Sequence, residues 1–125
     1  MSTKVDLAEL DRVMRSYGFA YLMTVGDGAR PHAVAVVPSL IDGDLVIRDP
    51  GTRTSANALA CPAVSLVWPP DDVDQYSLIV DGEAIEGPGE LRISPSRAVL
   101  HRPAPASDGA ESCGSDCDEL TTPTT

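Results

Sequence analysis

The chain has few basic residues and no long apolar run. Its 125 residues include 9 Lys and Arg against 19 Asp and Glu, which gives a formal net charge of −10. A surface this acidic repels phosphate backbones and anionic lipids, so we expect neither nucleic acid nor a membrane as a partner. No run approaches the roughly 18 apolar residues of a membrane-spanning helix, and the N-terminal sequence MSTKVDLAEL has no apolar core typical of a secretory signal. We therefore expect a cytoplasmic protein.

Several motifs that carry chemistry are also absent from the sequence. It contains no glycine-rich phosphate loop, no nucleophile elbow and no paired zinc-ligand spacing. We interpret both histidines, His32 and His101, mainly as structural residues, and Cys61 has no base beside it in the sequence. The carboxylates between residues 71 and 74 lack the spacing of a calcium-binding loop. These residues therefore predict neither a catalytic group nor a metal site.

The negative charge is distributed unevenly along the chain. Residues 1–106 contain all the basic residues, whereas residues 107–125 contain five acidic residues and no base. This last segment has too few large apolar groups to offset the entropy of ordering it. We therefore expect one folded domain over residues 1–106 and a disordered acidic tail over residues 107–125. Cys113 and Cys117 in the tail could form a disulfide or supply two of the four ligands of a structural zinc, and their role stays open.

The spacing of apolar residues predicts a helix near the N-terminus, because they recur at intervals of three and four. Thr3 or Asp6 is placed to cap the start of this helix, and Gly18 is placed to end it. The apolar face consists of Leu7, Leu10, Val13, Met14 and Tyr17.

The stretches that follow read mainly as strands joined by tight turns. Glycine-containing turns at 26–31 and 42–44 each join two short runs rich in strand-forming residues. Residues 54–60 suit a short helix, and Ser94 with Pro95 suits the start of a last one. The expected strands are residues 19–25, 32–37, 40–41, 45–47, 63–68, 76–86 and 90–93. This order predicts a mainly β protein, a small antiparallel barrel with short flanking helices.

One segment combines groups that suit an anion. Residues 49–57, Asp-Pro-Gly-Thr-Arg-Thr-Ser-Ala-Asn, follow a strand and open a helix. The free N–H groups and the dipole at a helix start favour negative charge. Arg53 could bind a phosphate through two N–H groups while neighbouring hydroxyls donate further hydrogen bonds. The alternative interpretation is an ordinary helix start, rich in hydroxyls, with a surface arginine.

Taken in order, these motifs resemble the FMN-binding split-barrel family, whose best-known member is pyridoxamine 5′-phosphate oxidase. The resemblance covers about residues 6–106, nearly the whole expected domain. The matching pieces are residues 21–25, 28–32, 42–47, 51–54, 58–67 and 80–84. The ending, residues 97–103 followed by Cys-Gly-Ser-Asp-Cys, resembles an actinobacterial subgroup of this family.

The resemblance implies an antiparallel split barrel that forms a homodimer. FMN, or an 8-hydroxy-5-deazaflavin, would bind in each of two clefts between the subunits and transfer hydride to a small-molecule substrate. Thr52 and Arg53 match the family's phosphate-binding turn, although Thr54 stands where many members have lysine. Arg48 and Arg30 could compensate for the charge contact that is lost. The cofactor-binding residues expected from the segment and the resemblance together are Arg48, Thr52, Arg53, Thr54, Ser55, Trp68 and Ser77.

Three hypotheses of function follow, the third of which makes the tail with Cys113 and Cys117 a metal- or redox-responsive switch that acts on a neighbour's cleft. The first is an oxidoreductase of unknown substrate, resembling pyridoxamine 5′-phosphate oxidase, that works through bound FMN or deazaflavin. The second is a non-catalytic protein on the same barrel, which either carries the cofactor or has none. The missing lysine at Thr54 and the uncharged strand at residues 33–37 favour the second. The long C-terminal extension of the oxidase is absent, which argues against pyridoxamine phosphate as the substrate.

Overall fold

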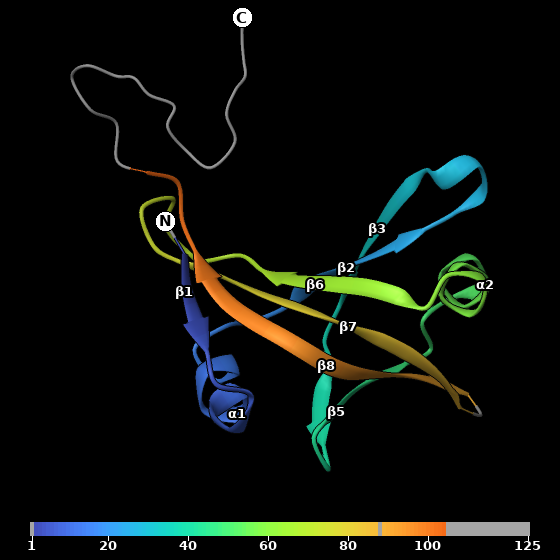
Figure 1. Cartoon of the computed structure of the whole chain (residues 1–125), viewed down its shortest axis with the longest axis horizontal. Coiled ribbons are helices and arrows are strands. Elements are labelled where there is room, and N and C mark those ends of the chain that lie inside the picture. Colours follow the sequence, from blue (N-terminus) through green and yellow to red (C-terminus); the bar gives the residue numbers. More distant parts are fainter. Residues whose placement is uncertain (1, 88, 105–125) are drawn as a thin grey trace, which may run out of the picture.

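The fold is a single curled antiparallel sheet with two short α-helices. The computed structural model describes residues 2–87 and 89–104. Within them, eight strands form one sheet in the order β3-β2-β6-β7-β8-β5-β4, and β1 pairs with β8 beside this path. Figure 1 shows α1 and α2 at opposite ends of the sheet, with the β2–β3 hairpin beside α2. The prediction of a mainly β split barrel with short flanking helices is confirmed.

The predicted acidic tail, with Cys113 and Cys117, lies outside the described residues. Its disorder and the domain boundary at residue 106 therefore stay predictions. Among the helices that the structure describes, none has the length and apolar character needed to cross a membrane.

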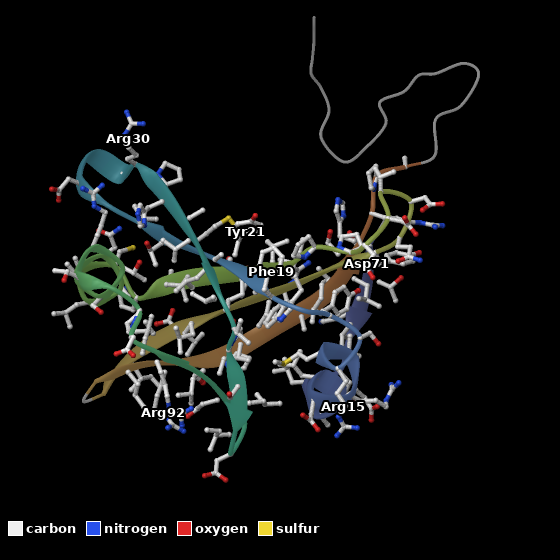
Figure 2. All side chains as sticks on the ribbon, turned by 180° about the vertical axis from the view of Figure 1, so that it is seen from behind. Arg15, Phe19, Tyr21, Arg30, Asp71 and Arg92 are labelled. Atoms are coloured by element: carbon white, nitrogen blue, oxygen red, sulfur yellow. The ribbon has the colours of Figure 1, made fainter. Side chains whose placement is uncertain are left out.

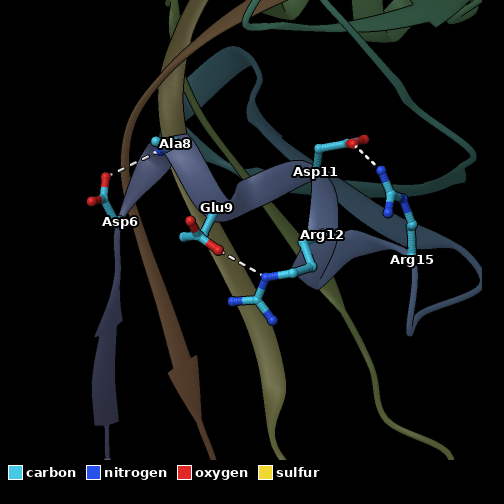
Figure 3. A network of polar contacts seen from close by, with 6 residues as sticks. All are labelled: Asp6, Ala8, Glu9, Asp11, Arg12 and Arg15. Atoms are coloured by element: carbon cyan, nitrogen blue, oxygen red, sulfur yellow. Dashed lines mark hydrogen bonds and ion pairs between the residues drawn. The ribbon is translucent and has the colours of Figure 1, made fainter.

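The chain begins with a strand that the sequence pattern did not predict. β1 (Ser2–Val5) pairs antiparallel with the end of β8. The 3-10 helix η1 (Leu7–Glu9) and the helix α1 (Leu10–Met14) follow it. The predicted cap is confirmed, because Asp6 Oδ1 accepts a hydrogen bond from the N–H of Ala8 at 3.1 Å (Figure 3). Gly18 does not end the helix, which stops four residues earlier.

Two features hold this N-terminal helical segment. On its exposed side, Arg12 pairs with Glu9 at 2.8 Å, and Arg15 pairs with Asp11 one turn away (Figure 3). On its inner side, the Tyr17 hydroxyl donates to the carbonyl of Tyr76 at 2.8 Å. Burial raises the pKa of the Tyr17 phenol, so the hydroxyl keeps the proton that it donates.

Both predicted hairpins are present. The first joins β2 (Ala20–Val25) to β3 (Pro31–Val36) through a 3-10 turn, η2 (Asp27–Ala29). The second joins β4 (Ser39–Ile41) to β5 (Asp44–Arg48) through two residues, Asp42 and Gly43. Both of these have positive φ angles, 52° and 83°, as a tight two-residue hairpin turn requires. The helix α2 (Thr52–Ala60) and the strand β6 (Ala63–Trp68) come next.

The last strand is longer than expected, whereas the one before it has the expected length. β7 (Ser77–Gly87) pairs with β8 (Glu90–His101) along almost their whole lengths. The predicted helix start at Ser94 and Pro95 is therefore wrong. Asp81 pairs with Arg97 whereas Gly82 pairs with Pro95, so β8 has one extra residue at this point. Proline is tolerated at such a bulge because the N–H that it lacks is not needed there.

The core fills the inner side of the curl. Side chains of β2, β6, β7 and β8 alternate between this core and the outer face of the sheet, as the period of a strand requires. Trp68 is 2% exposed and is among the largest of the buried side chains. The other large ones are Leu10, Leu22, Leu45, Leu66, Leu78 and Ile93.

The bulge depends on a glycine. A Cβ added to Gly82 would lie 2.5 Å from the carbonyl oxygen of Ser94. We expect Gly82→Ala to lower the free energy of unfolding by about 1–3 kcal/mol, because the backbone of β8 must move to accept the methyl group. Urea denaturation measures this loss. Gly18→Ala is the control, since a Cβ there meets no atom within 4 Å; equal effects of the two variants would contradict the prediction.

Candidate functional site

The predicted anion-binding segment lies at the surface where β5 leads into α2. Gly51 stands immediately before α2 with a φ of 95°, a conformation that side chains disfavour. As a glycine it has no side chain to cap the first turn, and that turn contains no acidic residue. The first N–H groups of α2 therefore remain available to an external acceptor.

A pocket of about 930 Å³ lies between α2 and the β2–β3 hairpin, and we call it the polar pocket. The α2 side contributes Thr52, Arg53 and Asn57, followed by Cys61 just beyond the helix. The hairpin side contributes Asp27, Arg30 and His32. Figure 2 shows Arg30 at the tip of this hairpin, with its side chain extended away from the sheet. The pocket thus has polar groups on both walls.

A hydrogen bond joins the two walls of the polar pocket. Asn57 Nδ2 donates to Thr24 Oγ1 at 3.2 Å, and Thr24 is only 2% exposed. Next along the hairpin, a Cβ added to Gly26 would lie 3.3 Å from the Asn57 side chain. The hairpin and the helix are therefore in close contact at this point, which sets the spacing of the walls.

His32 lies on the hairpin wall with an unsatisfied nitrogen. Its Nδ1 is buried and has no hydrogen-bond partner within the described part of the chain. A buried polar atom without a partner costs free energy, so native proteins have few of them. The structure therefore makes His32 a candidate functional residue, whereas the sequence favoured a structural role.

A second pocket of about 340 Å³ adjoins the same two segments of chain, and we call it the apolar pocket. Phe19, residues 34–37 and Ile47 line most of it. Arg48 at the end of β5 lines the rest, with Asp49 and Pro50 in the connection to α2.

The same two segments line both pockets. His32 of β3 and Thr52 at the start of α2 line the polar pocket, and the neighbouring residues 34–37 and 48–50 line the apolar one. The two pockets are therefore neighbours in a row. Most side chains of the smaller one are apolar, although Arg48 and Asp49 also line it, and the larger one has more polar side chains.

The arginines fall into two groups. Three of them, Arg30, Arg48 and Arg53, make no ion pair and no side-chain hydrogen bond within residues 2–87 and 89–104. All three line the two pockets. The arginines with a partner are Arg12, Arg15, Arg92, Arg97 and Arg102. An anion in these pockets would meet cations that are not already paired.

The predicted site residues occupy different surroundings. Thr52 and Arg53 share the polar pocket, and Arg48 lines the apolar one. Ser55 faces another side of α2, in a separate pocket of about 420 Å³ beside the β7–β8 hairpin. The side chain of Thr54 is buried beneath the helix.

Two further predicted residues lie away from these pockets. Trp68 is in the core, and Ser77 is half-buried at the start of β7, opposite His101. Whether any of the predicted residues binds a ligand stays a prediction. In the described residues, no three His, Cys, Asp or Glu side chains come together as metal ligands would.

Sequence reasoning did not connect the hairpin residues of the polar pocket with α2. Arg30 was expected only to compensate, with Arg48, for the missing lysine at Thr54, and His32 and Asn57 were not among the predicted cofactor-binding residues. Cys61 was considered only by its apolar context. The available signal was Gly26 in the turn at 26–31, whose lack of a side chain lets the hairpin approach Asn57 of the helix. No local pattern predicted which element that hairpin would contact.

The outer face of the sheet carries exposed apolar side chains. Tyr21 is 43% exposed and packs edge-on against Phe19, with ring centroids 5.2 Å apart. Figure 2 shows these two residues close together on the sheet. Strand pairing places four further residues on the same face: Met23, Ala35, Val67 and Ile79. This outer face spans β2, β3, β6 and β7.

The chain resembles two mycobacterial proteins along nearly its whole length. They are the uncharacterised proteins Mb0449c of Mycobacterium bovis and MT0457 of Mycobacterium tuberculosis. Each is 42% identical over 132 residues, which covers 91% of this chain and 93% of the relative. A scan against protein-family models found no match.

Solved structures share the fold at low sequence identity. An FAD-binding protein of Mycobacterium smegmatis has a TM-score of 0.61 and 20% identity, covering 82% of this chain and all of its own. An F420 reductase has a TM-score of 0.58 and 15% identity, covering 70% and 94%. A candidate pyridoxamine 5′-phosphate oxidase of Listeria innocua has 0.60 and 14%, covering 75% and 96%. These likenesses confirm the split-barrel fold.

The contact between Asn57 and Thr24 can be tested through stability. We expect Asn57→Ala to lower the free energy of unfolding by about 1–2 kcal/mol, because the buried Thr24 hydroxyl loses this partner. Urea denaturation measures the change. Leu59→Ala on the exposed side of the same helix is the control, and it should cost less. An unchanged unfolding midpoint in Asn57→Ala would show that this bond does not join the walls.

Proposed function

The chain belongs to the family of the uncharacterised mycobacterial proteins Mb0449c and MT0457. From its fold and its two adjoining pockets, we propose that it is an oxidoreductase that binds a flavin-type cofactor. The observation that carries this proposal is that a pocket lined mainly by apolar side chains adjoins one lined by several polar side chains. A flavin nucleotide has a flat, largely apolar ring system and an anionic tail, so the two halves of such a molecule match the two pockets. The names of several structural neighbours, which include FAD-binding and F420 proteins, support this cofactor class.

The residues present fit such a group. Phe19, Val34 and Val36 offer an apolar surface to the ring. Thr52 and Arg53, with the uncapped N–H groups of α2, offer donors to the first phosphate of the tail. The polar pocket contains two arginines against one aspartate in a chain whose net charge is −10, so its local charge is opposite to that of the whole protein.

The cofactor, when bound, supplies the hydride-transfer chemistry. The chain's own contribution is to orient it and to exclude water from one side of the ring. Arg53 and the start of α2 would hold the tail, and the side chains of β3 would line the space for the ring. A general base in the chain is not required for this chemistry, which agrees with the apolar lining of the smaller pocket.

A non-catalytic cofactor-binding protein is the second candidate. The observation that favours it is β3, where residues 33–36 are uncharged and present only alanine and valine beside the apolar pocket. Such a wall holds a ring without offering a polar group to a substrate. Bound cofactor that is reduced and reoxidised during turnover of a substrate would favour the oxidoreductase, and binding without turnover would favour this alternative.

We also propose that the protein is a homodimer that pairs through the outer face. Exposed aromatic residues and methionine are enriched at protein–protein interfaces, and an apolar patch across four strands is unusual on a surface open to water. The patch reaches Phe19, which also lines the apolar pocket. A second subunit on this face would therefore lie beside the proposed position of the ring.

Cofactor binding should depend on Arg53. We expect Arg53→Ala to weaken FMN binding by about 10- to 100-fold, because a hydrogen bond to a charged group is worth about 1.5–3 kcal/mol. Quenching of FMN fluorescence on titration with protein measures the affinity. Arg12→Ala on α1 is the matched control and should bind as the wild type does. Equal affinities of Arg53→Ala and wild type would refute the assignment of this phosphate site.

The dimer should depend on Tyr21. We expect Tyr21→Lys to produce monomers, because it would bury a charge in the proposed interface without a partner. Sedimentation equilibrium measures the mass of the assembly. Val73→Lys is the control, since Val73 is 85% exposed in the loop between β6 and β7. A wild-type monomer, or a Tyr21→Lys protein that stays dimeric, would refute this interface.

A further inference from the structure

A line of polar side chains lies beside the apolar residues of the outer face, and we call it the polar row. Ser65 of β6 is paired with Asp81 of β7, which is paired with Arg97 of β8, so the three residues follow one another across the sheet. Figure 1 shows these three strands side by side. Val67 and Ile79 of the outer face stand two residues away on β6 and β7. Because residues two apart on a strand share a face, the polar row continues the outer face.

The bulge in β8 is what turns Arg97 toward this face. Ile93 is buried in the core, and an uninterrupted strand would place Arg97 on the same side. One extra residue, Ser96, shifts the alternation, so that Ala98 is buried and Arg97 faces outward. Ser96 Oγ donates to the carbonyl of Asp81 at 3.2 Å. The bulge is therefore held against β7 at the residue that Arg97 contacts.

Asp81 and Arg97 both keep unused hydrogen-bonding capacity. Ser65 Oγ donates to Asp81 Oδ1 at 2.6 Å, and Arg97 Nη1 donates to Asp81 Oδ2 at 3.4 Å. A carboxylate accepts up to about four hydrogen bonds and a guanidinium donates about five. The Asp81 side chain is 41% exposed and that of Arg97 is 53% exposed. Each group can therefore contact a second partner of opposite charge.

The order of charges in the polar row suits a second copy of the same chain. A protein with a net charge of −10 repels its own copy over most of its surface, so a face that pairs with itself must be locally balanced. The polar row supplies one acid and one base side by side. In a two-fold dimer every contact occurs twice, so a contact of Arg97 with the partner's Asp81 is matched by the reverse contact.

Resting on the proposed homodimer, we propose that Arg97 of each subunit forms an ion pair with the partner's Asp81, while Ser65 holds the carboxylate in position. The apolar residues of the outer face supply contact area, and the two ion pairs fix how the two faces are aligned. A partner with another order of charges would bring like charges together, which disfavours pairing with it. The polar row thus makes the face selective for a second copy of this chain.

A charge-swapped chain tests the ion pairs between subunits. Asp81→Arg combined with Arg97→Asp keeps an acid and a base next to each other within the subunit, so the chain should fold. Two swapped chains should pair with each other, whereas a swapped chain beside a wild-type chain would place arginine against arginine and aspartate against aspartate. Tagged swapped protein and untagged wild type are unfolded in urea and refolded together, and native mass spectrometry measures the mixed dimers. We expect their share to be at least ~10-fold below the roughly one half that random pairing gives.

Two controls accompany this experiment. Tagged and untagged wild type should reach the random share, which shows that refolded subunits mix. Glu9→Arg combined with Arg12→Glu swaps an exposed ion pair on the N-terminal helical segment, which packs on the core side of the sheet through Leu10. This swapped chain should mix freely with wild type.

A second variant measures the strength of the same contact. Arg97→Gln should raise the dissociation constant of the dimer by about 10-fold and reduce its dependence on salt, because a charge-assisted contact between subunits is lost. Sedimentation equilibrium at low and high salt measures both quantities.

The inference is overturned by a random share of mixed dimers, or by an unchanged dissociation constant in Arg97→Gln. Either result would show that Asp81 and Arg97 pair only within their own subunit. The proposed homodimer would survive it if Tyr21→Lys still produces monomers. If the wild type is a monomer, the homodimer and the inference are both refuted, whereas the proposed cofactor site is still tested by Arg53→Ala.

Discussion

The pairing of β7 with β8 is the interaction on which the rest of the structure depends. β7 continues through β6 and β2 to β3, and β8 continues through β5 to β4, so this ribbon joins the two halves of the sheet. At Gly82 and Pro95 the ribbon contains a bulge, which bends a strand and increases its twist. The curled sheet brings β3 close to the connection between β5 and α2, although β3 is at the edge of one half and β5 belongs to the other. Both pockets lie along that approach.

The electrostatics of the pockets follow from which arginines are already paired. Four of the described arginines pair with a carboxylate: Arg12, Arg15, Arg92 and Arg97. Arg30 and Arg53 have no such partner in the described residues, so binding an anion does not require an ion pair to be broken first. The dipole of α2 adds to the attraction because its first turn lacks a capping side chain. An acidic protein thus presents a local site for an anion.

Much of the secondary structure follows from local chemistry and could be predicted. The errors of that prediction have a common cause. Asp42 with Gly43 predicts a tight hairpin because both residues tolerate positive φ, and Asp6 predicts a helix cap because its carboxylate can accept a neighbouring N–H. The mistaken helix at Ser94 and the missed strand β1 both concern β8, whose partners lie far away in the sequence. Strand pairing over that separation outweighed the local preference of Ser-Pro for a helix start.

The candidate site likewise has one part that local sequence predicts and one part that depends on distant segments of the chain. A glycine followed by a hydroxyl residue and an arginine indicates a helix start that is open to an anion. A helix start depends on only a few neighbouring residues, so Thr52 and Arg53 could be predicted from the sequence as candidate anion ligands. The residues that lie opposite these groups could not be predicted, because the position of the β2–β3 hairpin depends on the curl of the whole sheet. The tertiary structure brought Arg30 and His32 opposite α2, and it placed Trp68 in the core and Ser55 on another side of the helix. The chain thus specifies its donors locally, whereas packing between distant segments decides which of them share a pocket.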